Sequence, residues 1–109
     1  MHLTIITKAL KELKIYNDIM KTIRMKISGM VQGVFFRKYI QEEAKKLEIK
    51  GHVRNLENGE VEVVAEGSPE NVDAMLAICK KGAPHSTVKD VDVQELNHIG
   101  FDEFKLLDI

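Results

Sequence analysis

The chain is poor in the residues that cross-link or stiffen small proteins. Its 109 residues include one cysteine, two prolines and no tryptophan. A single cysteine excludes a disulfide within the chain, and a chain of this length can bury a hydrophobic core without a disulfide or a structural metal. We therefore expect an ordinary globular domain in a reducing, cytoplasmic setting, with Cys79 as an inert thiol on an apolar helix face.

Long apolar runs and a strong excess of charge are also missing. No segment reaches the roughly 20 apolar residues of a membrane span, and the start of the chain lacks the pattern of a secretory signal peptide. The formal net charge is −1, and residues 1–25 hold five lysines and arginines against two acidic residues, so the remainder is acidic. An acidic domain of this kind lacks the basic face of a nucleic-acid-binding domain. We expect neither a nucleic-acid nor a membrane partner. The four histidines are scattered without the spacing of metal ligands, so no metal site is expected.

Residues 1–21 differ in pattern from the rest. Ile6, Leu10 and Leu13 recur at helical spacing with lysines between them, which is compatible with a short amphipathic helix. An isolated helix of this length is only marginally stable in water, so a flexible leader is the alternative. We interpret residues 1–21 as an N-terminal leader and residues 22–109 as the folded domain.

Hydrophobic periodicity in residues 22–109 predicts five strands and two helices. The Asn58-Gly59 pair predicts a hairpin, Ser68 predicts a helix N-cap, and a break in the apolar pattern between Val88 and Val91 indicates a bulge. The expected strands are 22–28, 52–56, 60–66, 87–96 and 101–107, and the expected helices are 36–47 and one that runs from Pro69 to Lys81. The order βαββαβ with an extra terminal strand predicts an α+β fold of the ferredoxin-like, split βαβ type. In it an antiparallel sheet carries both helices on one face.

The most informative segment runs from Ile27 to Arg37. An apolar strand leads into Gly29 and Gly33, and Arg37 follows at the start of a helical pattern. Backbone N–H groups of a tight loop can converge on one anion, and a helix N-terminus behind them adds partial positive charge. An arginine at the same place can bind two oxygens in a bidentate fork. The order therefore predicts a site for a small, strongly anionic group such as phosphate.

Two motifs carry a resemblance to the acylphosphatase family. Residues 27–37 match its first signature at every position: aliphatic, any, Gly, any, Val-Gln-Gly-Val, any, Phe or Met, Arg. The second signature lies in residues 51–67, where His52 stands in place of the usual aromatic residue. The matching positions there are Gly51, Val53, Arg54, Asn55, Gly59, Val61 and Gly67. The resemblance covers the chain from about Ile23 to the C-terminus.

This resemblance implies hydrolysis of acyl phosphates to a carboxylate and inorganic phosphate, without a metal or a cofactor. It implies that Arg37 binds the phosphate and that Asn55 positions the attacking water. The residues expected to line the phosphate with backbone donors are Gln32, Gly33, Val34, Phe35, Phe36 and Arg37. The implied partner is a small acyl phosphate, and we expect a monomer.

The residue types suit this chemistry. Phosphoryl transfer through a loose transition state needs placement and charge stabilisation more than covalent help, and an asparagine both donates and accepts, so it can hold a water without titrating. Interpretations without a role in binding or catalysis stay open: Arg37 can be a solvated helix residue, Asn55 a strand-end residue, and the glycines can serve only to permit a turn.

A non-catalytic phosphate-binding or regulatory domain on the same fold is the alternative function. An RNA-binding module is set aside, because residues 60–66 are acidic and lack aromatics. His52 is a further candidate for an effect on substrate access or on pH response.

Overall fold

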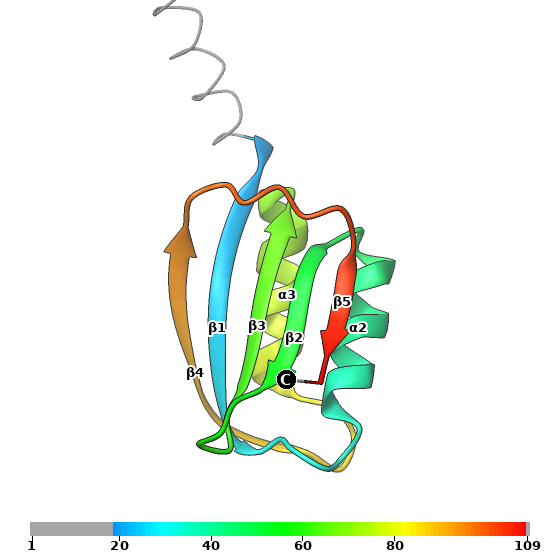
Figure 1. Ribbon diagram of the computed structural model, residues 1–109, viewed down its shortest axis with the longest axis vertical. Helices are drawn as coiled ribbons and strands as arrows, with labels where there is room; N and C mark the ends of the chain where they lie inside the picture. Colours follow the sequence, from blue (N-terminus) through cyan, green and yellow to red (C-terminus); the bar gives the residue numbers. More distant parts are fainter. Residues whose placement is uncertain (1–18, 109) are drawn as a thin grey trace, which may run out of the picture.

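The computed structural model describes residues 19–108, and the leader predicted for residues 1–21 lies almost entirely outside them. Five strands form one sheet in the order β4-β1-β3-β2-β5 (Figure 1). The strands are β1 (Lys21–Met30), β2 (Lys50–Asn55), β3 (Val61–Gly67), β4 (Thr87–Leu96) and β5 (Phe104–Leu107), and the helices are α2 (Phe36–Lys46) and α3 (Pro69–Lys81). The predicted βαββαβ order, with its extra terminal strand, is confirmed.

The sheet is mixed rather than wholly antiparallel. β1 pairs antiparallel with β3 and β4, and β2 pairs antiparallel with β3, but β5 pairs parallel with β2. Figure 1 shows the cause: the connection after β4 crosses one end of the sheet and enters β5 at the opposite edge. β5 therefore runs in the direction of β2. An edge pairing of this kind depends on the path of a loop, which hydrophobic periodicity does not report.

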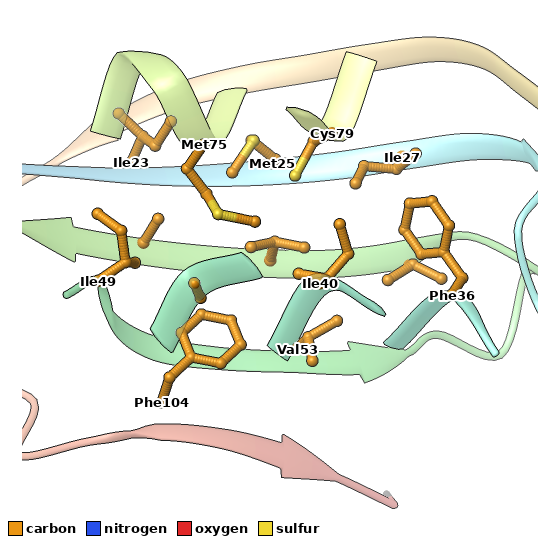
Figure 2. Close-up of a cluster of buried hydrophobic side chains, with 14 of the residues drawn as sticks. Ile23, Met25, Ile27, Phe36, Ile40, Ile49, Val53, Met75, Cys79 and Phe104 are labelled. Carbon is orange, nitrogen blue, oxygen red and sulfur yellow. The ribbon is translucent and has the colours of Figure 1, made fainter. Parts of the chain in front are cut away.

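Both helices cover one face of the sheet, and the core lies between the two layers (Figure 2). Alternate residues of β1 point into this layer, as the period of a strand requires. They meet the apolar stripes of the two helices. The stripes consist of Phe36, Ile40 and Ala44 on α2 and of Val72, Met75 and Cys79 on α3, all buried. Burial raises the pKa of the Cys79 thiol to about 12, so it stays protonated and unreactive, as expected.

The predicted bulge lies where β1 ends. The register between β1 and β4 shifts between Ser28 and Gly29, and Lys89 has no partner strand residue. Gly29 has a φ of 126°, and a Cβ there would collide with the carbonyl oxygen of Thr87. Only glycine fits this close approach of two backbones, and the resulting twist directs the chain from β1 into the loop that precedes α2.

The face of the sheet away from the helices is built around two buried carboxylates. Glu62 on β3 accepts from Arg24 Nε at 2.8 Å and from Arg54 Nε at 2.8 Å, and His52 Nε2 lies 2.9 Å from its Oε1. Burial by itself raises the pKa of Glu62, but the hydrogen bonds from Arg54, His52 and Arg24 outweigh that effect and lower it from 4.5 to about 2.

Glu66 lies further along β3 and fastens the connection between β4 and β5. Its carboxylate accepts the backbone N–H groups of Ile99, Gly100 and Phe101 at 2.9, 2.9 and 3.2 Å, together with the Thr22 hydroxyl. Burial acts to raise the pKa of Glu66, yet these hydrogen bonds lower it below its ordinary value. The carboxylate thus holds the loop that carries the chain across the sheet to β5.

The low pKa of Glu62 predicts an acid-sensitive contribution to stability. Because its folded pKa is depressed, the stabilisation is complete above the unfolded value of 4.5 and is lost as pH falls toward 2. Glu62→Gln should therefore lower the free energy of unfolding by on the order of 2 kcal/mol at pH 7, since a neutral amide pairs poorly with two guanidinium groups. The difference from wild type should shrink between pH 4.5 and pH 2. Urea unfolding at several pH values measures this.

The matched control is Glu57→Gln, which removes one exposed carboxylate from the turn after β2. We expect it to change the free energy of unfolding by less than about 0.5 kcal/mol at any of these pH values. A Glu62→Gln variant that is as stable as this control at pH 7 would contradict the assignment.

Candidate active site

The loop between β1 and α2 presents an open helix N-terminus. Gly33 and Phe35 have φ values of 74° and 58°, so two left-handed residues turn the chain tightly into α2. Phe35 is the N-cap residue of α2 and makes no side-chain capping hydrogen bond, and the first turn of α2 contains no acidic residue. The first N–H groups of a helix have no intrahelical partner. They therefore face the loop without a competing side-chain acceptor from the cap.

The second helix shows what is unusual about the first. At the start of α3, Ser68 Oγ accepts the Asn71 N–H at 3.3 Å, Pro69 follows at the first helical position, and Glu70 lies in the first turn. This confirms the predicted N-cap. The N-terminus of α3 is neutralised by its own sequence, whereas that of α2 is open to an external anion.

A pocket of about 350 Å³ lies against the loop and the start of α2. Figure 1 shows this end of the sheet at the bottom, where the loop after β1, the β2–β3 hairpin and the end of β5 meet. Arg37 from α2 and Asn55 from the end of β2 both line this pocket. The remaining lining residues are Val31, Gly33, Phe35, Phe36, Lys38 and Leu106.

Arg37 is held by the end of the chain. Its Nη1 donates to the carbonyl oxygen of Leu107 at 2.6 Å and to Asp108 Oδ1 at 3.1 Å. The anchor leaves the guanidinium group half-buried beside the pocket, and its other N–H groups make no hydrogen bond with residues 19–108. The sequence did not point to Leu107 or Asp108, because only the pairing of β5 beside β2 brings them to Arg37.

Asn55 faces the helix side of the sheet. Val53, two residues earlier on the same face, is buried in the core, whereas Arg54 points to the opposite face and binds Glu62. Asn55 Oδ1 is buried and has no hydrogen-bond partner among the described residues. Most buried polar atoms in proteins are paired, so an unpaired acceptor at the wall of a pocket suits a site that takes up a polar molecule.

The other predicted residues divide into three groups. Gly33, Phe35 and Phe36 line the pocket. Gln32 instead links the loop to the β2–β3 hairpin, because its Nε2 donates to the carbonyl oxygens of Leu56 at 2.9 Å and Glu60 at 2.8 Å. Val34 lines a neighbouring hollow. The prediction for Gln32 and Val34 concerns their backbone N–H groups and stays a prediction.

His52 lies away from the pocket. It is on the opposite face of the sheet, bound to Glu62, with its ring edge-on to Phe101 at a centroid distance of 5.8 Å. His52 therefore belongs to a cluster of Arg24, His52 and Arg54 around Glu62, called the Glu62 cluster below, and does not line the pocket. Its effect on substrate access stays a prediction. Lys38 was missed by the sequence prediction, although a second cation directly after Arg37 was the signal available for it.

Residues 19–108 contain no group of three histidines, cysteines or acidic residues that could hold a metal ion. No helix in this part of the chain is long and apolar enough to cross a membrane.

The fold and the pocket define a small α+β domain with a pocket at the uncapped N-terminus of a helix. The family model for Acylphosphatase matches residues 23–106, and the chain belongs to the acylphosphatase family. It is 45% identical to an acylphosphatase of Methylococcus capsulatus over 81% of this chain and 97% of that protein. Among solved structures, it resembles an acylphosphatase from Coxiella burnetii, with a TM-score of 0.80 and 31% identity over 84% of this chain and 96% of that one. The acylphosphatase from Bacillus subtilis gives a TM-score of 0.77 and 35% identity over 80% and 98% of the two chains.

Proposed function

We propose that the protein hydrolyses the carboxyl–phosphate anhydride of acyl phosphates, releasing a carboxylate and inorganic phosphate. The observation that carries the proposal is that Arg37 and Asn55 line one pocket at the uncapped N-terminus of α2. This pairs a cation and helix N–H groups with a neutral group that can hold water. Membership in the acylphosphatase family supports the same conclusion.

In this proposal the loop and Arg37 bind the phosphoryl group. The N–H groups at the start of α2 and the guanidinium N–H groups not used by Leu107 and Asp108 donate to the phosphate oxygens. Charge on these oxygens shifts as the bond to the carboxylate breaks, and preorganised donors stabilise the transition state because they need no reorganisation. The hydrogen bonds of Arg37 Nη1 to Leu107 and Asp108 contribute to this preorganisation, because they fix the direction in which the remaining guanidinium donors point.

Asn55 has the complementary role. Its unpaired Oδ1 can accept a hydrogen bond from the attacking water and thereby orient the water oxygen toward phosphorus. The water oxygen forms the new P–O bond, the P–O bond to the acyl group breaks, and the carboxylate leaves with its electron pair. A carboxylate is a good leaving group, so the step needs no strong acid, and the water proton passes to the phosphate product or to solvent.

The test is turnover of benzoyl phosphate by the purified wild-type protein in the presence of a chelator. We expect hydrolysis well above the uncatalysed rate with no added metal, followed by the loss of benzoyl phosphate absorbance and the release of inorganic phosphate. The alternative function, a non-catalytic phosphate-binding domain, predicts binding of inorganic phosphate in a titration but no turnover. A rate equal to the uncatalysed one would exclude the enzymatic function.

We also propose that residues 22–109 are sufficient for this activity and act as a monomer. The five strands, the two helices and the pocket all lie within residues 21–107. Deleting residues 1–20 should therefore leave kcat/KM and the thermal midpoint nearly unchanged, with a single species of monomer mass in light scattering. A large loss of either quantity on deletion would show that the N-terminal segment belongs to the working structure.

A further inference from the structure

A second hollow adjoins the phosphate pocket. It has a volume of about 230 Å³, and it shares Phe35 and Lys38 with the pocket that contains Arg37 and Asn55. On its other side lie Ala83, Pro84 and His85, from the segment that joins α3 to β4. Figure 1 shows this segment passing along the bottom of the molecule beside the loop that leads into α2. The two hollows are therefore neighbours with Phe35 as part of the common wall.

Phe35 has properties that the fold does not explain. The residue is 86% exposed, so it gains little from burial. Its φ of 58° is a left-handed conformation that strains the backbone of a bulky residue, whereas glycine would adopt it without strain. An exposed aromatic residue with a strained backbone at the rim of a site indicates a role in binding.

A second non-glycine residue with a positive φ lines the same hollow. Only three non-glycine residues of the described part of the chain have a positive φ, and two of them, Phe35 and His85, line this hollow. The turn that carries His85 is fastened, because the Ser86 N–H and the Ser86 hydroxyl both donate to the Ala83 carbonyl oxygen, at 3.1 and 2.7 Å. The turn that carries His85 is thus held in position by hydrogen bonds of its own.

The lining suits an apolar group. Val34, Phe35, Tyr39, Ala83 and Pro84 supply carbon surface, and the polar residues Lys38, Glu42 and His85 complete the lining. A cavity of roughly 150 Å³ with apolar walls is large enough for a benzene ring, so 230 Å³ accommodates an aromatic or branched aliphatic group.

We propose that this hollow is the acyl subsite: it receives the organic group of an acyl phosphate whose phosphate occupies the loop, and it favours aromatic or branched acyl groups over acetyl. The proposal rests on the function proposed above. Phe35 is the residue that sets the preference, because it lines both hollows, and Pro84 belongs to the second segment that lines the smaller one.

The test compares kcat/KM for benzoyl phosphate with kcat/KM for acetyl phosphate in each variant. Both substrates place the same phosphate in the loop, so damage to the loop cancels in the ratio, and so does the difference in intrinsic reactivity when variants are compared. Phe35→Gly relieves the backbone strain and should fold. We expect the benzoyl-to-acetyl ratio to fall about tenfold in Phe35→Gly and less, but measurably, in Pro84→Ser. The matched control is Ile99→Ala, an exposed apolar residue that lines neither hollow, and its ratio should equal that of wild type.

A binding measurement separates failure of the subsite from failure of the proposed function. Benzylphosphonate should bind the wild-type protein more tightly than methylphosphonate, and Phe35→Gly should lose this advantage. Wild-type turnover with an unchanged ratio in both Phe35→Gly and Pro84→Ser would overturn the subsite alone. Absence of turnover would overturn the enzymatic function, and the phosphonate comparison would then decide whether the hollow binds apolar groups.

Discussion

Replacing Arg37 with alanine is expected to lower kcat/KM for benzoyl phosphate by on the order of 10³-fold to 10⁵-fold, the range found where an arginine stabilises a transferring phosphoryl group. Arg37 is the cation that the structure anchors at the pocket, through Leu107 and Asp108. Arg37→Lys should recover little of this loss, because an ammonium group cannot both keep the anchor and offer a planar fork to the phosphate.

The control for charge alone is Lys45→Ala. It removes one positive charge from an exposed position on the same helix, outside the pocket. We expect it to retain wild-type kcat/KM within about twofold at moderate salt, since exposed charges are screened over about 10 Å. The thermal midpoint of Arg37→Ala should stay within a few degrees of wild type. Near-wild-type turnover in Arg37→Ala would remove the central element of the proposed mechanism.

Replacing Asn55 with alanine is expected to lower kcat by on the order of 10²-fold or more, since loss of alignment of a reacting group costs about that much. KM should change little, because Asn55 is assigned to the water and not to the phosphate. Steady-state kinetics with benzoyl phosphate separates the two parameters. Asn55→Asp keeps the size of the side chain but adds a negative charge beside the phosphate, so it should also lose activity.

Stability provides an independent check on Asn55. A buried acceptor without a partner costs free energy in the folded state, of the order of 1 kcal/mol or more. Asn55→Ala removes that atom, so its thermal midpoint should equal or exceed that of wild type while its activity falls. Such opposite changes are typical of residues kept for function at the expense of stability. A variant that loses both activity and stability would identify Asn55 as a structural residue.

The Glu62 cluster acts on the fold rather than on the chemistry, because it lies on the opposite face of the sheet from the pocket. It joins β1, β2 and β3 through Arg24, His52 and Arg54. β2 carries Asn55 at its end, one residue after Arg54. The cluster thus fastens the strand that presents Asn55, and its predicted acid sensitivity concerns the fold rather than the chemical step.

Local features of the sequence were sufficient to predict the helices, the strands and the tight loop before α2. The N-cap at Ser68 and the bulge opposite Gly29 depend on a few neighbouring residues, so their signals are contained in short segments. The same holds for the tight loop before α2, where Gly33 and Phe35 turn the chain into the helix. The resemblance in two signatures then pointed to Arg37 and Asn55.

Only the tertiary structure decided which of these residues share a space. Arg37 and Asn55 come from different elements, and they line one pocket because β2 lies between β3 and β5 under α2. The anchor of Arg37 on Leu107 and Asp108 requires the parallel pairing of β5. The hollow beside Phe35 requires the segment before β4 to pass the loop. The sequence by itself determined local conformation, since this follows from backbone preferences, and its local charge predicted an anionic ligand. Contacts between distant segments follow from strand order and loop paths, which no local pattern encodes.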